Sequence, residues 1–150
     1  MEILMAYLHY LAIIGIAGTL VAELVACRPG MTAEQARRIA TVDLIFFGAA
    51  MLALATGLLR LFLYAKGWRF YAPNPFFITK MALYVAIALI SIRPTRQFLR
   101  WRRVLVDGGA PPPAAEILAA RRLVHIELAL LVLMPLMAVL MARGIGRLTP

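Results

Sequence analysis

The sequence predicts an all-α protein, a four-transmembrane-helix bundle with up-down topology. The first reason is composition: 63% of the 150 residues are hydrophobic and the mean hydropathy is +0.86, whereas average proteins are about half apolar. The second is distribution, because the apolar residues gather into four spans at about 5–27, 41–63, 76–92 and 123–143. Each span approaches the roughly 17–25 residues that a helix needs to cross a bilayer. We therefore expect residues 1–150 to form a single integral membrane domain.

The connection after the first span carries clear helix-end signals. Pro29 and Gly30 end the first helix. Thr32 is followed three residues later by Gln35, which is the spacing of a capping box. The second helix is therefore predicted to begin near Ala33, before its apolar run.

Small residues recur at every fourth position of the second span, as Ala49, Ala53 and Gly57. Such a stripe lets two helix backbones approach closely in lipid, where packing drives helix association. We expect this face to contact another helix.

The third helix has a strong start signal, because Asn74 can cap it and Pro75 suits its first position. Beyond Ile92, the chain continues past Pro94 as a basic and partly apolar stretch. We expect this stretch to lie at the membrane interface. Three of its side chains are expected to face lipid: Phe98, Leu99 and Trp101.

The fourth helix is separated from the third by Asp107-Gly-Gly-Ala110 and three prolines. Pro113 is predicted to be its first residue, because proline is favoured at that position. The helix would then begin before the membrane.

The basic residues predict an orientation. With four spans, the termini and the second connection share one side, which has five basic residues: Arg60, Lys66, Arg69, Arg143 and Arg147. The opposite side has ten: Arg28, Arg37, Arg38, Arg93, Arg96, Arg100, Arg102, Arg103, Arg121 and Arg122. The positive-inside rule places the first and third connections in the cytoplasm and both termini on the opposite side, which in a bacterial inner membrane is the periplasm.

The positions of the basic residues along the chain explain the formal net charge of +9. The arginines lie between apolar runs, so they predict contacts with anionic lipids at the cytoplasmic arginine cluster and no nucleic-acid binding. The single cysteine, Cys27, excludes an internal disulfide and a cysteine-based metal cluster.

Ionisable residues inside the spans form two groups by depth. His9 and Lys80 lie a turn into their spans, and Arg60 reaches the same outer leaflet. His9 is either a haem iron ligand, a proton-transfer group or a histidine bonded to a carbonyl. Lys80 either pairs with an anion such as a propionate or extends to the interface.

The inner-leaflet group comprises Glu23, Asp43, His125 and Glu127. Glu23, Asp43 and His125 could bind a divalent metal; the alternative is neutralisation by nearby arginines, namely Arg28, Arg93, Arg121 or Arg122. His9 lies about 21 Å from Glu23 along its helix. The two histidines therefore occupy opposite leaflets, and they would not hold one haem together.

Several stretches resemble a bacterial family of predicted four-span inner-membrane proteins of unknown function. They are Tyr7-Leu-His-Tyr-Leu-Ala, Gly18-Thr-Leu-Val-Ala-Glu23, Asp43-Leu, Ala55-Thr-Gly-Leu-Leu-Arg60, Asn74-Pro-x-Phe-x-x-Lys80 and Pro94-Thr-Arg-x-Phe-Leu-Arg. The resemblance covers roughly residues 1–103. It implies the fold and brings no activity.

A more distant resemblance concerns Leu8-His9 and Lys80-Met81-Ala82-Leu83. These elements are similar to ones in membrane-bound protoporphyrinogen IX oxidase, where the histidine and lysine are implicated in haem or porphyrin binding. Copper-resistance D-type membrane proteins have a similar first helix. The chain departs from the oxidase pattern at residues 14–18, where it has Ile-Gly-Ile-Ala-Gly.

The sequence leaves three functions open. The first is a haem b- or porphyrin-binding protein with a redox role, using His9, Lys80 and Arg60. The second is a non-catalytic accessory subunit of a larger membrane complex, or a homo-oligomer. The third is a small proton or metal-ion transporter. Whether the protein is an enzyme stays open.

Overall fold

The computed structural model describes residues 1–64 and 68–146, and within those ranges it is helical without strands. The four long helices are α1 (Glu2–Ala26), α2 (Ala33–Leu59), α4 (Pro75–Val106) and α5 (Ala114–Ala142). A π-helical turn, η1 (Arg60–Tyr64), extends α2, and the short helix α3 (Trp68–Tyr71) precedes α4.

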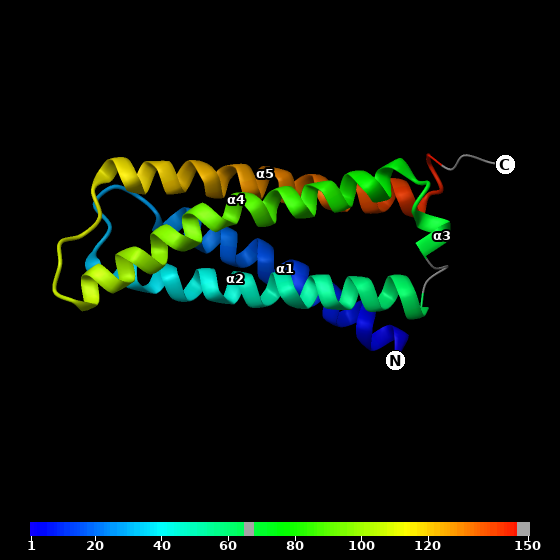
Figure 1. The fold of residues 1–150 in the computed structure, drawn as a ribbon, viewed down its shortest axis with the longest axis horizontal. Coiled ribbons are helices and arrows are strands. Elements are labelled where there is room, and N and C mark those ends of the chain that lie inside the picture. The colour runs from blue at the N-terminus through cyan, green and yellow to red at the C-terminus, as the bar shows by residue number, and fades with distance from the viewer. Residues whose placement is uncertain (65–67, 147–150) are drawn as a thin grey trace.

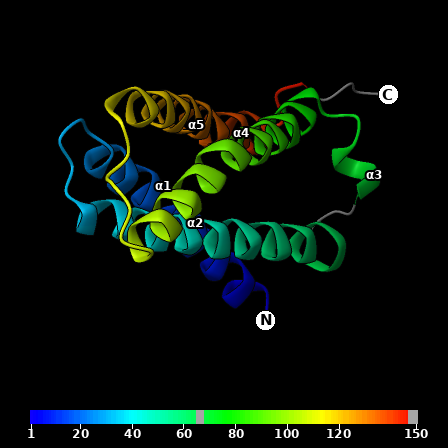
Figure 2. The same ribbon diagram turned by 60° about the vertical axis from the view of Figure 1, so that its left-hand side comes forward.

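The long helices alternate in direction (Figure 1). The connections 27–32 and 107–113 lie at one end, which we call the loop end; the N-terminus, η1, α3 and the end of α5 lie at the other, which we call the terminal end. Helix α1 contacts α2 and α5, and α4 contacts the same two helices. Helix α4 starts beside α5 and ends beside α2 in both views (Figures 1 and 2). The four helices therefore form a closed ring.

All four long helices are long and apolar enough to cross a membrane. Many large apolar side chains point outward, including Ile3, Phe47 and Val132, which is the surface that a bilayer requires. The predicted four-helix, up-down bundle is confirmed. Lys66 and Arg147, which entered the orientation argument, lie outside the described residues, and the orientation itself stays a prediction.

The helix starts follow the local signals. The Thr32 hydroxyl accepts from the backbone N–H of Gln35 at 3.2 Å, and the Gln35 side chain accepts from the N–H of Thr32 at 2.9 Å, so the predicted capping box is confirmed. The Asn74 side chain accepts from the N–H of Phe76 at 2.9 Å and donates to the carbonyl of Ile145 at 3.3 Å. Pro113 is the N-cap of α5 and Ala114 its first residue, so the helix begins one residue later than expected.

The small-residue stripe of α2 packs on α1, as the sequence predicted. A Cβ atom added to Gly15 of α1 would lie 3.3 Å from the Cβ of Ala49, which is tighter than ordinary van der Waals contact. Ala53 is buried at the same contact. Close approach of these two backbones sets the position of His9 on α2.

The expectation that Phe98 and Trp101 face lipid is wrong. Helix α4 continues through Pro94 to Val106, and both aromatic side chains are buried, whereas Leu99 is 39% exposed. The Trp101 indole donates to the Glu116 carboxylate at 2.9 Å. Glu116 lies in the first turn of α5, so this helix contacts Trp101, and no local pattern in the α4 sequence reports that partner.

Candidate functional site

The imidazole of His9 contacts α2 through its Nδ1 atom. That atom lies 3.0 Å from the carbonyl oxygen of Ala53 and 3.0 Å from the hydroxyl oxygen of Thr56. The Ala53 carbonyl can only accept, so the hydrogen bond to it requires a proton on Nδ1. The Thr56 hydroxyl has carbonyl acceptors of its own, Leu52 at 2.6 Å and Ala53 at 3.3 Å, and it can accept from the same N–H. In the neutral ring, Nε2 keeps a free lone pair.

Gly57 leaves room for this contact between His9 and α2. A Cβ atom at position 57 would lie 3.2 Å from Cε1 of His9. Glycine thus lets the imidazole approach the α2 backbone closely enough to bond the Ala53 carbonyl.

Two cationic side chains lie within electrostatic range of His9. They are Arg60 at the start of η1 and Lys80 of α4, and they also act on each other. The Arg60 guanidinium lies 5.9 Å from the centroid of the Tyr10 ring, a cation–π contact. His9, Arg60 and Lys80 come from three different elements at the terminal end and interact electrostatically there; we call them the cationic cluster.

In the described residues, no carboxylate forms an ion pair with the cationic cluster. Within residues 1–64 and 68–146, the ion pairs join Arg38 to Glu34 and Arg100 to Glu116. Arg60 and Lys80 therefore carry positive charge into an apolar bundle without a carboxylate partner in the described part of the chain. Such an arrangement favours an anion.

A second cluster gathers carboxyl groups nearer the loop end. Glu23 of α1, Asp43 of α2 and Glu127 of α5 interact electrostatically with one another, and they are 2%, 2% and 1% exposed. Each has one buried oxygen without a hydrogen-bond partner. The Thr95 hydroxyl of α4 donates to Asp43 at 2.9 Å. We call Glu23, Asp43 and Glu127 the carboxyl cluster.

In the described part of the chain, no arginine forms an ion pair with this cluster, so the structure does not support the alternative of neutralisation by arginines. Arg28, Arg93 and Arg122 are exposed. Arg121 instead donates to the carbonyls of Leu24 and Cys27, where it caps the C-terminal end of α1. None of the described arginines forms an ion pair with the three carboxyl groups.

His125 does not join Glu23 and Asp43. It is exposed on α5, and its Nδ1 lies 3.0 Å from the carbonyl oxygen of Arg121 in the same helix. In the part of the chain that the structure describes, no three His, Cys, Asp or Glu side chains are placed to hold a metal ion. Glu127 occupies the place in the cluster that the metal hypothesis gave to His125.

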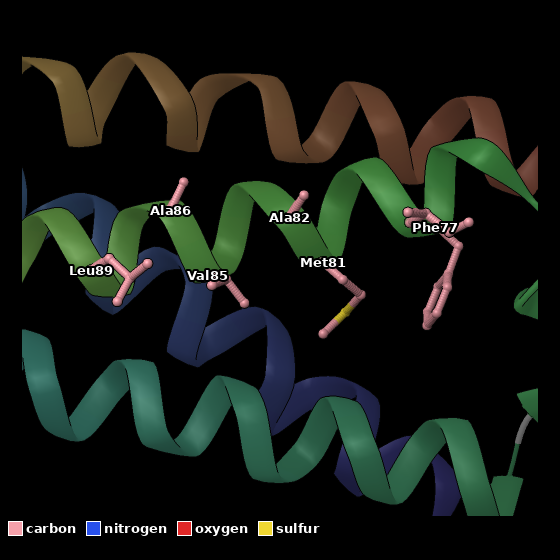
Figure 3. A pocket seen from close by; sticks show the side chains of 7 residues that line it. Phe77, Met81, Ala82, Val85, Ala86 and Leu89 are labelled. Atoms are coloured by element: carbon pink, nitrogen blue, oxygen red, sulfur yellow. The ribbon is translucent and has the colours of Figure 1, made fainter.

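An open apolar groove of about 570 Å³ runs along α4. Figure 3 shows Met81, Val85 and Leu89 pointing to one side of the helix, while Ala82 and Ala86 point toward α5. Lys80 is not among the lining residues. The groove therefore suits lipid chains and offers no polar contact to a specific ligand.

Thr56, Gly57 and Thr95 are site residues that the sequence did not reveal. The spacing of residues in the sequence could have indicated Thr56 and Gly57. Glu23 lies 14 residues after His9, and Thr56 lies 13 residues after Asp43. In an antiparallel helix pair, placing Glu23 beside Asp43 therefore places His9 beside Thr56 and Gly57.

The fold and these two clusters define a four-helix membrane protein with ionisable groups held inside its bundle. The chain belongs to the family described as predicted membrane protein (DUF2214), whose model matches residues 1–146. This finding confirms the resemblance to a family of predicted four-span membrane proteins. No curated protein and no solved structure matches the chain, and the likeness to the oxidase and copper-resistance proteins stays a prediction.

Cys27, which follows α1, should be unreactive in the folded protein. Its side chain is fully buried, its thiol donates to the carbonyl of Ile117 at 3.5 Å, and burial raises the pKa of the thiol to about 11. The thiolate is the reactive form, so maleimide labelling should be very slow at pH 7. A Cys27→Ser, Arg28→Cys double variant moves the thiol to an exposed neighbour and should label rapidly. Equal labelling rates at pH 7 for the wild-type protein and this variant would contradict the burial.

Proposed function

We propose that this membrane protein binds a haem b or a porphyrin at the cationic cluster and that a bound haem gives it a redox role. The observation that carries the proposal is the hydrogen bond that joins His9 to α2. Its Nδ1–H is bonded to the Ala53 carbonyl, which leaves Nε2 as the ligand atom. Metal-ligating histidines commonly donate their other ring N–H to a carbonyl in this way.

The cations of the cluster fit the acidic part of the same ligand class. Haem and protoporphyrin both carry propionate groups, and the described part of the chain gives Arg60 and Lys80 no carboxylate. A guanidinium and an ammonium at one depth can each bind a propionate oxygen by a charge-assisted hydrogen bond. On the predicted orientation, this site lies in the outer leaflet.

One histidine of the chain is available for such a ligand. His125 belongs to α5 and lies on its exposed surface, two residues from the carboxyl cluster. His9 would therefore be the histidine of this chain that holds the iron, with Arg60 and Lys80 binding the propionates. A bound haem would supply reversible one-electron chemistry, while His9, Arg60 and Lys80 bind and orient it.

The visible spectrum of the purified, haem-supplemented protein tests the proposal. We expect a Soret band that His9→Ala removes and His125→Ala, the matched control, leaves unchanged. Lys80→Gln and Arg60→Gln should weaken the affinity, each by about tenfold, since a charged hydrogen bond contributes roughly 1.5–3 kcal/mol. Iron-free protoporphyrin should respond to the two cation variants and not to His9→Ala.

Absence of a Soret band, or a band equally sensitive to both histidine substitutions, would overturn the proposal. A colourless protein that purifies with a large membrane complex would favour the accessory-subunit function.

A further inference from the structure

We propose that Glu23, Asp43 and Glu127 form a proton-binding site, in which the three carboxyl groups hold and exchange protons as one coupled unit. This inference does not depend on the cationic cluster or on any pigment. It concerns different residues, at a different depth in the bundle.

The positions of the three groups carry the first step. They come from three helices, α1, α2 and α5, and each residue is at least 98% buried. The unpartnered atoms are Oε1 of Glu23, Oδ2 of Asp43 and Oε1 of Glu127. A buried acceptor without a donor is costly, on the order of 1–3 kcal/mol. Three such atoms in one cluster indicate that a donor is needed there, and a carboxyl proton supplies one.

Charge carries the second step. An ionised carboxylate without a partner is expensive to bury, and three that act on one another also repel. In the described part of the chain, the charged groups of the surrounding helices do not compensate. Arg121 is bonded to α1 carbonyls. The other basic groups near this end are exposed: Arg28 after α1, Arg37 and Arg38 of α2, Arg93, Arg96, Arg100, Arg102 and Arg103 of α4, and Arg122 and His125 of α5.

A metal ion is the alternative source of positive charge, and the geometry does not favour it. Within residues 1–64 and 68–146, no three metal-ligating side chains are arranged around a common point. Protons need no such arrangement, because each binds to a single oxygen. The cluster therefore selects protons as its ligand.

A hydrogen bond from Thr95 distinguishes Asp43 from Glu23 and Glu127. Its hydroxyl donates to Oδ1 of Asp43, and a hydrogen bond of this kind stabilises the ionised form of the acceptor. Within the described part of the chain, no hydroxyl or N–H group donates to Glu23 or Glu127. We therefore assign Asp43 as the proton acceptor of the cluster. The exchange step breaks the O–H bond of Glu23 or Glu127 and forms an O–H bond at Oδ2 of Asp43, so the proton count of the cluster is conserved.

Infrared spectroscopy of the pigment-free protein in lipid vesicles tests this site. At neutral pH, we expect the C=O stretch of protonated carboxyl groups, with a shift in D₂O. Glu23→Gln and Glu127→Gln should each reduce this signal by about half. Glu34→Gln and Glu116→Gln replace exposed or ion-paired carboxylates on α2 and α5, so they should leave it unchanged.

A second readout needs no substitution, in case the glutamine variants do not fold. Carbon-13 NMR of wild-type protein labelled at the glutamate side-chain carboxyls should show two groups protonated at neutral pH. All glutamates ionised at neutral pH would overturn the inference. So would a rise in thermal stability on adding Na⁺, Ca²⁺ or Zn²⁺ that Glu127→Gln abolishes, because the cluster would then be a cation site.

Discussion

Replacing Phe98 by alanine is expected to lower the free energy of unfolding of the bundle by roughly 3 kcal/mol. Phe98 is fully buried in α4, where it contacts Trp101 with ring centroids 5.4 Å apart. Phenylalanine-to-alanine changes in soluble cores cost about 3–5 kcal/mol. The lower end applies here, because lipid also solvates apolar groups and the lost packing contacts make up most of the effect.

Leu99→Ala is the matched control for Phe98→Ala. Leu99 is the next residue of α4 and is 39% exposed, so its truncation should change the free energy of unfolding by less than about 1 kcal/mol. Reversible unfolding in mixed detergent micelles would measure both. Equal effects of the two variants would show that Phe98 faces lipid, as the sequence alone suggested.

Replacing Gly57 by leucine is expected to separate α1 from α2 and to break the hydrogen-bonded contacts of His9 with α2. Even a Cβ atom at this position would lie 3.2 Å from the imidazole, and the larger side chain would break the contacts of Nδ1 with Ala53 and Thr56. Overpacking costs about 1–3 kcal/mol. We therefore expect both a lower free energy of unfolding and, on the proposed function, at least a tenfold loss of haem affinity.

Gly48→Leu controls for the change in helix propensity. Gly48 lies on the same helix, and a Cβ atom added there meets nothing within 4 Å. It should leave haem affinity and stability close to those of the wild-type protein. If Gly57→Leu and Gly48→Leu behave alike in both measurements, the close approach of His9 to α2 is contradicted.

The sequence predicted the helices well because their signals are local. The capping box at Thr32 and Gln35 and the Asn74-Pro75 start each act within one turn, and an apolar run of membrane length is a property of one continuous segment. The same signals could not show which face of a helix is buried. In a membrane helix both faces are apolar, so Phe98 and Leu99 look alike in sequence although one is buried and the other exposed.

The candidate sites were predicted in part for a related reason. Depth along each span grouped His9 with Lys80 and Arg60, and Glu23 with Asp43, because depth depends only on position within a span. Depth along the span could not show whether His125 or Glu127 lies next to Glu23 and Asp43. These residues differ by about 3 Å in height but by about 200° around the helix, so one faces the surface and the other the carboxyl cluster.

The central claim is that Nε2 of His9 is a free ligand atom, and nitrogen-15 NMR of histidine-labelled protein tests it most directly. A His125→Gln variant leaves His9 as the only histidine. We predict a proton on Nδ1, an unprotonated Nε2, and a shift of the Nε2 resonance alone when zinc protoporphyrin IX, which accepts one axial ligand, is added. A proton on Nε2 in the neutral ring, or an Nε2 resonance that zinc protoporphyrin leaves unchanged, would contradict the proposed site.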